Sequence, residues 1–218
     1  MKKKNQRNMC LSLTFLSAFV LWTFAVQVVD VRPIGPNGSD VGFAGINGFV
    51  HNLTGVHMSL YVVTDWLGLV PIFVAFGFGL FGFFQLLKRK RLNKVDYSIF
   101  VLGIFYVAVI ILYMLFEMIT VNYRPVLING ILEKSYPSST TLLVMTVMPT
   151  AIMQFNSRIK SRALRKSVSI IIISFIIFMV IGRLVSGVHW FTDIIGGLLL
   201  SAGLVIMYRT YMLRGGAK

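Results

Sequence analysis

The chain has 218 residues, of which 56% are hydrophobic and only 13% are charged, and its formal net charge is +14. A mean hydropathy of +0.80 is typical of a polytopic membrane protein and excludes an ordinary soluble domain. The single cysteine, Cys10, lies in the first apolar run, so an intramolecular disulfide and a cysteine-based metal site are both excluded.

Six apolar stretches follow one another, each long enough to cross the hydrocarbon core of a bilayer as a helix. The sequence therefore predicts an all-α fold, a single membrane domain over residues 1–218 with six transmembrane helices in one bundle. Small residues in the last stretch, at Gly196, Gly197, Ser201 and Gly203, predict close helix packing. The predicted spans are residues 9–29, 58–87, 97–121, 138–155, 168–184 and 190–211.

The first stretch follows a short basic head, a pattern that signal peptides and retained membrane helices share. No clear small-x-small cleavage site lies near Val29-Asp30, which favours a retained helix.

The basic residues gather on one side of the predicted bundle. The side with the two termini, the 88–94 loop and the 157–166 loop carries seventeen lysines and arginines, and the other side carries four. The positive-inside rule then makes both termini cytoplasmic and turns the remaining loops outward from the plasma membrane. The charge of +14 thus reflects topology and attraction to anionic lipid rather than binding of nucleic acid. No obligate protein partner is evident.

Residues 30–57 form a polar, glycine-rich connector, and the prolines and glycines of residues 32–40 exclude a helix there. Its length is typical of a lid or an interfacial segment. Two histidines, His51 and His57, lie in its second half. Either both lie in the headgroup layer, or one of them reaches the active site.

The loop between the last two spans holds an Arg, a His and an Asp close to hydrocarbon, where ionisable groups are costly and usually functional. His189 and Asp193 are four residues apart, so on a helix the carboxylate can hold the proton of one imidazole nitrogen and leave the other as a nucleophile. Arg183 lies upstream of Ser186-Gly187, where the chain can bend and return its guanidinium to the His. The planar guanidinium group of Arg can donate two parallel hydrogen bonds to a phosphate group.

Two further polar segments are expected on the same side. Asn122-Tyr123-Arg124-Pro125 follows the third span, and Lys134 to Thr140 opens the fourth. Pro137, Ser138 and Ser139 form an ordinary helix N-terminus, which also offers free N–H groups to an anion. In a compact bundle these segments and the 183–193 loop can converge on one outer pocket.

The order Arg-Pro, Pro-Ser and Arg-x5-His-x3-Asp resembles the three signature motifs of the type-2 phosphatidic acid phosphatase superfamily, whose integral-membrane members are six-helix lipid phosphatases and diphosphatases. The resemblance implies that His189 attacks phosphorus and forms a phosphohistidine, that Asp193 orients it, and that Arg124, Arg183 and Ser138 hold the phosphate, with Ser139 beside them. It also implies that no metal or other cofactor takes part. Gly182 stands where the family usually has Ser.

Two positions depart from the family's motifs. Glu117 occupies the place of a phosphate-binding Lys, and Thr140 occupies the place of the His that protonates the leaving oxygen. A Thr hydroxyl is far too weak an acid for that transfer. Lys134 either replaces the missing Lys, with Glu117 pairing with Arg124, or simply offsets Glu133 in a solvated loop.

These observations predict an outward-facing membrane phosphatase or diphosphatase whose partners are the bilayer and a lipid phosphate or polyprenyl diphosphate. Because Thr140 is no acid, a diphosphate, whose leaving group needs no proton, fits better than a monophosphate. Two alternatives remain: a non-catalytic lipid-phosphate binder or transporter, which Glu117 and Thr140 favour, and a phosphotransferase that passes the phosphoryl group from His189 to another alcohol.

Overall fold

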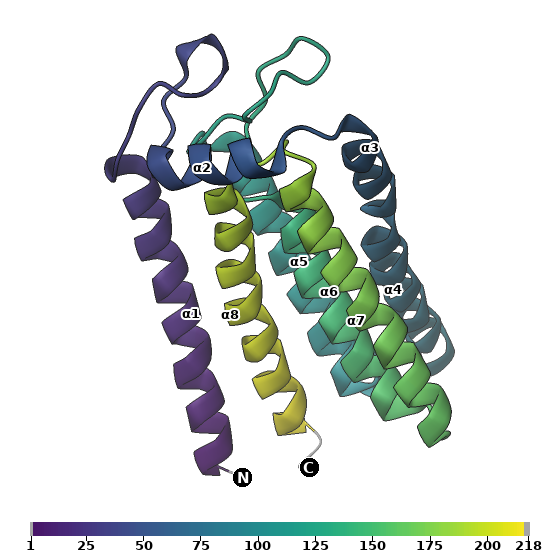
Figure 1. Ribbon diagram of the computed structural model, residues 1–218. Coiled ribbons are helices and arrows are strands. Elements are labelled where there is room, and N and C mark those ends of the chain that lie inside the picture. Colours follow the sequence, from purple (N-terminus) through teal and green to yellow (C-terminus); the bar gives the residue numbers. More distant parts are fainter. Residues whose placement is uncertain (1, 216–218) are drawn as a thin grey trace.

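The computed structural model describes residues 2–215 and contains, within them, eight α-helices and no strand. Helix α2 is short and lies across the bundle, whereas the other helices run along it (Figure 1). The bounds are α1 Lys2–Val28, α2 Ala44–Thr54, α3 Met58–Leu67, α4 Leu69–Arg89, α5 Tyr97–Met118, α6 Ser139–Arg158, α7 Arg162–Val185 and α8 Phe191–Gly215.

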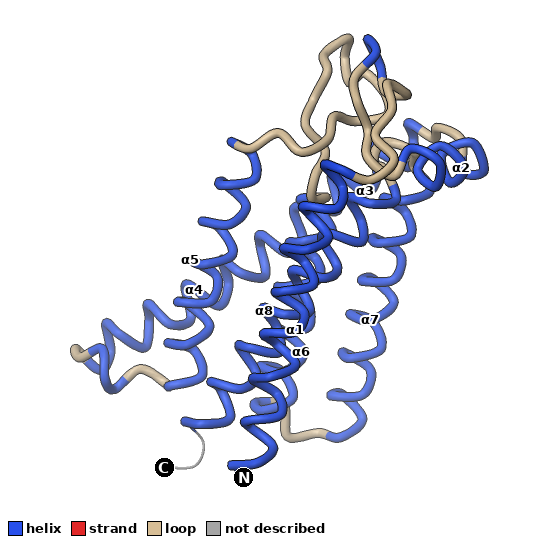
Figure 2. The backbone as a smooth tube through the Cα atoms, turned by 90° about the vertical axis from the view of Figure 1, so that its left-hand side faces the viewer, coloured by secondary structure: helices blue, strands red, loops and turns tan. Residues whose placement is uncertain are grey.

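The long helices stand side by side (Figure 1). The start of α1 and the end of α8 lie at the same end of the bundle (Figure 1), as the alternation of spans predicts. Helix α2 and the connecting loops cover the opposite end (Figure 2). We refer to that opposite end as the loop end.

Five segments are long and apolar enough to cross a membrane, namely 5–28, 58–89, 97–118, 162–185 and 191–213. The second of these is the pair α3 and α4, which meet at Gly68. The all-α membrane fold is thereby confirmed, while the fourth predicted span, residues 138–155, which forms most of α6, is not among the five.

Helix α6 is less apolar because it lies inside the bundle. It contacts α4, α5, α7 and α8, and its buried face carries Thr140, Thr141, Thr146, Thr150 and Gln154. A helix surrounded by other helices meets little lipid, and its polar side chains find partners within the protein. The hydroxyl of Thr150, for example, donates to the carbonyl oxygen of Thr146 at 2.9 Å.

The prediction that residues 30–57 form a loop was wrong for the second half of that segment. The prolines restrict only the first part, where a single 3₁₀ turn forms at Pro36–Gly38. Residues 44–54 contain no proline and form α2, even though Gly45 and Gly48 lie within it. Tertiary contacts of α2 with α8 outweigh the low helix propensity of its glycines.

Small residues let α8 pack closely, as predicted. A Cβ atom at Gly203 would lie 2.7 Å from the Leu16 side chain of α1, and one at Gly197 would lie 3.1 Å from Thr141 of α6. The Ser12 hydroxyl also donates to the carbonyl oxygen of Gly203 at 2.7 Å. The contacts at Gly203 hold α8 against α1, and the one at Gly197 holds the start of α8 against the start of α6, where both helices carry predicted site residues.

Candidate active site

A pocket of about 490 Å³ opens at the loop end, where the three polar segments meet. It is lined mainly by polar side chains from α3, α5, the 122–137 loop, the start of α6, the end of α7 and the loop before α8. The lining residues are Asp65, Tyr113, Phe116, Glu117, Arg124, Glu133, Lys134, Ser135, Tyr136, Pro137, Ser139, Leu142, Arg183 and His189. The predicted convergence of the segments on one pocket is thus confirmed.

A tight turn brings His189 to this pocket. Arg183 lies in the last turn of α7, and the chain then reverses at Gly187, which has a φ of 70°. A Cβ atom at Gly187 would lie 2.0 Å from the carbonyl oxygen of Gly55, so both the conformation and the close approach require glycine. The turn places the Nη2 atom of Arg183 at 3.1 Å from the Nε2 atom of His189.

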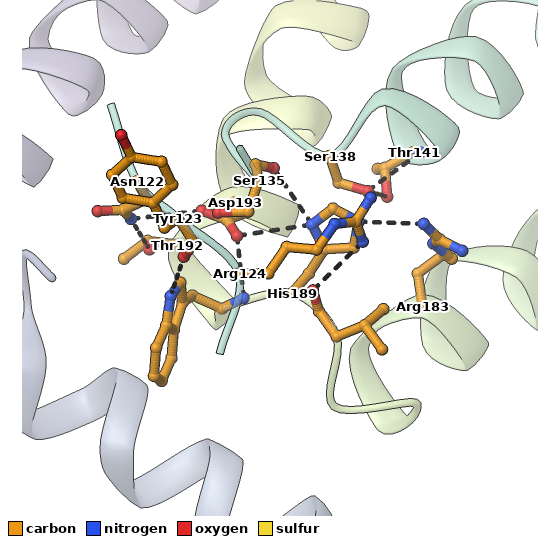
Figure 3. A network of polar contacts seen from close by, with 12 residues as sticks. Asn122, Tyr123, Arg124, Ser135, Ser138, Thr141, Arg183, His189, Thr192 and Asp193 are labelled. Carbon is orange, nitrogen blue, oxygen red and sulfur yellow. Dashed lines mark hydrogen bonds and ion pairs between the residues drawn. The ribbon is translucent and has the colours of Figure 1, made fainter. Parts of the chain in front are cut away.

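Two guanidinium groups converge on the same imidazole nitrogen (Figure 3). The Nη1 atom of Arg124 lies 3.3 Å from His189 Nε2, close to the Arg183 contact described above. Guanidinium groups can only donate, so Nε2 must be the acceptor, and the ring proton must be on Nδ1. The Nδ1 atom lies 3.2 Å from the carbonyl oxygen of Ser135, which can accept that proton. The geometry therefore selects the tautomer with a free lone pair on Nε2.

Asp193 lies near the His189 imidazole but does not form the predicted hydrogen bond with it. Its Oδ2 atom lies 3.6 Å from His189 Nδ1, an ion-pair distance rather than a hydrogen bond. The same oxygen accepts a hydrogen bond from the Trp190 amide at 2.9 Å, and Asn122 donates to Oδ1 at 3.4 Å. The predicted direct proton contact is therefore made by Ser135, while Asp193 provides negative charge beside the ring and caps the start of α8.

His189 is 3% exposed, and burial next to two guanidinium groups lowers the pKa of its imidazole well below the usual value. Both causes act against the protonated form, because an imidazolium would lose its hydration and be repelled by Arg124 and Arg183. The ring is therefore neutral at physiological pH, the state in which it can act as a nucleophile.

The two arginines are held by residues that the motifs do not include. Both guanidinium groups lie over the ring of Tyr61, at 5.1 Å for Arg183 and 5.9 Å for Arg124. Arg124 also forms an ion pair with Glu133 at 2.9 Å, and Arg183 lies 3.5 Å from the Oδ1 atom of Asp65. An acid within an apolar span is a recognisable signal for Asp65, whereas Tyr61 and Glu133 carry no such signal.

Arg183 is only 1% exposed, and its Nε atom has no hydrogen-bond partner among residues 2–215. Its one carboxylate partner, Asp65, is itself 57% exposed and lies at the long distance given above. A buried charge with an unused donor is costly unless an anion binds to it. The arrangement therefore suits an anion with several oxygens, placed next to His189 Nε2.

The two serines at the start of α6, both predicted to contact phosphate, lie in different surroundings. Ser138 is fully buried, and its hydroxyl oxygen accepts hydrogen bonds from the amide and the hydroxyl of Thr141, at 3.4 and 3.0 Å. Its amide donates to the carbonyl oxygen of Asp193 at 3.1 Å. Ser139 lines the pocket, but Ser138 does not. Ser138 thus caps α6 and connects it to α8, and Ser139 is the serine that faces the pocket.

Thr140 also lies outside the pocket lining and is 8% exposed. Its methyl group packs near the junction of α3 and α4, where a Cβ atom at Gly68 would lie 3.6 Å from Thr140 Cγ2. This position fits the prediction that Thr140 does not replace the acid of the family motif.

The contacts of Lys134 match neither of its two predicted roles, as a phosphate-binding cation or as the partner of Glu133. Its Nζ atom donates to the carbonyl oxygens of Glu117 and Met118, at 2.9 and 3.0 Å, and so satisfies the C-terminal end of α5. The suggested pair of Glu117 with Arg124 is wrong, because Arg124 pairs with Glu133. Glu117 itself lines the pocket, so the site carries a carboxylate where the family has a cation.

The two histidines of the first connector do not line the pocket. The Nε2 atom of His57 lies 2.9 Å from the carbonyl oxygen of Thr54, and the side chain is exposed. The His51 ring packs against Trp190, with 5.5 Å between the ring centroids. The alternative in which one of them reaches the active site is therefore not observed, because α2 and the start of α3 direct both rings elsewhere.

Comparisons with known proteins concern the segment that contains the motifs and the overall fold. Residues 117–215 match the PAP2 superfamily. The fold is similar to the crystal structure of a transmembrane PAP2-type phosphatidylglycerolphosphate phosphatase from Bacillus subtilis, with a TM-score of 0.62 and 17% identity over 93% of this chain and 96% of that one. No curated protein sequence matches the chain. Residues 117–215, which contain all three motifs, are therefore similar to the PAP2 superfamily, and the whole fold is similar to that of a membrane PAP2-type phosphatase.

Proposed function

We propose that this membrane protein is a lipid phosphatase that works through a phosphohistidine at His189. The observation that carries the proposal is the convergence of Arg124 and Arg183 on His189 Nε2, at 3.3 and 3.1 Å. Two buried cations next to a neutral nucleophile form a binding site for a phosphoryl group whose phosphorus would face the lone pair.

The chemistry can proceed in two displacements. The Nε2 lone pair attacks phosphorus, the bond from phosphorus to the leaving oxygen breaks, and the arginines stabilise the charge on the non-bridging oxygens. The imidazole becomes positive in this step, and the Ser135 carbonyl and the Asp193 carboxylate compensate that charge from the Nδ1 side. Water then attacks the phosphohistidine, and inorganic phosphate is released with the lone pair restored to Nε2.

The leaving group decides which lipid fits best. A monoester expels an alkoxide whose conjugate acid is about as weak an acid as water, with a pKa far above neutral. A positioned acid usually accelerates such a step about a hundred- to ten-thousand-fold. A diphosphate expels a phosphate monoester with a second pKa of roughly 6, which can leave unprotonated. Thr140 is no acid, and neither His51 nor His57 lines the pocket. A polyprenyl diphosphate or a diphosphorylated lipid is therefore the proposed substrate.

The proposed orientation puts the pocket outside the cell and both termini in the cytoplasm. It is supported by the sixteen basic residues that lie, within residues 2–215, at the end opposite the loop end. Asn129, an exposed residue in the loop between Arg124 and Glu133, is suited to test it. In a Cys10→Ser background, Asn129→Cys should react with a membrane-impermeant thiol reagent in intact cells. Reaction only after lysis would invert the topology.

The experiment that tests the activity is phosphate release from lipid monophosphates and diphosphates in detergent. His189→Ala serves as the inactive control. Release that depends on His189 supports the phosphatase, and binding without release would identify the non-catalytic lipid-phosphate binder that Glu117 and Thr140 favour. Transfer of labelled phosphate to an added alcohol in place of water would identify the phosphotransferase.

A further inference from the structure

Helix α2 carries an apolar face that no part of the described chain covers. Ile46, Phe49 and Leu53 are 44%, 66% and 74% exposed. At 100° per residue these three side chains fall within one arc of the helix, while the exposed Asn52 lies on a different side. Monomeric proteins rarely leave such an apolar arc in contact with water.

The position of α2 indicates what covers this arc. Figures 1 and 2 show α2 lying across the loop end, at the periphery of the bundle rather than over its centre. The helices before and after it, α1 and α3, expose apolar side chains such as Phe24 at 64% and Val62 at 48% on the surfaces of their membrane spans. The apolar arc of α2 therefore continues the lipid-facing surface of these spans.

The opposite face of α2 is attached to the start of α8. Asn47 is fully buried, and its Nδ2 atom donates to Thr192 Oγ1 at 3.0 Å and to the Gly42 carbonyl oxygen at 2.7 Å. Its Oδ1 atom accepts from the Thr192 amide at 3.1 Å. Thr192 directly precedes Asp193, so Asn47 caps the turn that holds the proposed orienting carboxylate.

We propose that α2 is an interfacial helix whose arc of Ile46, Phe49 and Leu53 inserts among the acyl chains of the leaflet at the loop end. Its buried Asn47 is a positioning residue that ties this membrane contact to the first turn of α8. Amphipathic helices of this kind lie in the plane of the interface, with the apolar side toward the acyl chains. The membrane contact is independent of the proposed catalytic function, whereas the role of Asn47 in turnover rests on it.

The membrane contact can be measured without any activity. Phe49→Cys and Asn52→Cys, each in a Cys10→Ser background, would carry a small fluorophore in protein reconstituted in phosphatidylcholine vesicles. The probe at residue 49 should be quenched by lipids brominated on their acyl chains, and the probe at residue 52 by aqueous iodide. Equal quenching of the two probes by iodide would overturn the insertion of α2.

The role of Asn47 requires a kinetic readout. Asn47→Ala removes all three hydrogen bonds and should lower kcat by about tenfold or more, with KM within twofold, because a small displacement of a positioned group slows chemistry more than binding. Asn52→Glu, on the exposed side of α2, is the matched control and should leave kcat unchanged. An unchanged kcat in Asn47→Ala, or a change in KM alone, would overturn the positioning role while leaving the quenching result standing.

Discussion

The pocket has two halves that differ in how closely they keep the family's chemistry. In the nucleophile half, at the junction of α7 and α8, His189 contacts Arg183 through Nε2 and lies next to Asp193 through Nδ1. The leaving-group half, at the end of α5 and the start of α6, has Glu117 where the family has a Lys, and Thr140, at the position of the family's His, lies outside the pocket lining. The residues for the proposed phosphoryl transfer to His189 are thus in place, whereas the family's residue for protonating the leaving oxygen is not.

The largest expected effect comes from removing the nucleophile. His189→Ala should abolish phosphate release and any acid-labile phosphoenzyme, because no other imidazole lines the pocket. Radiolabelled substrate followed by acid quench measures both quantities. His57→Ala, which changes an exposed ring outside the pocket, should leave them intact. Persistent turnover in His189→Ala would remove the basis of the comparison between the two halves.

The second effect concerns the carboxylate of the nucleophile half. Asp193→Asn should lower kcat by less than the roughly ten-thousand-fold known for an orienting Asp in another His system, because the Ser135 carbonyl also holds the Nδ1 proton. Binding of a substrate analogue should be nearly unchanged. Single-turnover kinetics separates the two quantities, and an unchanged rate would leave Asp193 as a helix cap only.

The third effect tests the leaving-group half. The parent should hydrolyse a lipid diphosphate with a kcat/KM about a hundredfold or more above that of the matching monophosphate, because only the monophosphate needs a proton donor and Thr140 provides none. Phosphate release from the two lipids, measured side by side in detergent, gives this ratio. A parent that cleaves phosphatidic acid as fast as a polyprenyl diphosphate would contradict the proposed substrate.

A fourth effect appears in the pH dependence. The lowered pKa of His189 keeps its imidazole neutral in acid, so kcat/KM should stay constant as the pH falls through the usual histidine range and decline only below it. The rate is lost by protonation, on the acid side of the profile. A profile of kcat/KM from pH 4 to pH 8 measures this, and a midpoint near the ordinary histidine value would show that the ring is less shielded than the structure indicates.

The smallest effect is expected at Lys134. Lys134→Ala should change KM less than twofold and lower the free energy of unfolding by about 0.3–1 kcal/mol, because the ammonium group serves the carbonyl end of α5. Lys134→Arg should restore most of that stability. A marked rise in KM with unchanged stability would instead make Lys134 the phosphate-binding cation of the leaving-group half.

The sequence by itself determined the features that depend on composition and local spacing. Hydropathy marked five of the six predicted spans, since a span exposed to lipid has to be apolar along its whole length. The spacing of Arg183, His189 and Asp193 identified the nucleophile half, because the residues of one tight turn and the adjoining helix ends lie close together in any fold that preserves them.

Only the tertiary structure decided which groups from distant segments meet at the pocket. The Ser135 carbonyl accepts the proton assigned to Asp193, Tyr61 and Glu133 hold the arginines, and Lys134 serves α5. These contacts depend on the directions of side chains and on the packing of helices far apart in sequence, which periodicity does not encode. For the same reason the sequence did not predict that α6 lies inside the bundle, away from lipid, or that residues 44–54 form the helix α2, which packs against α8.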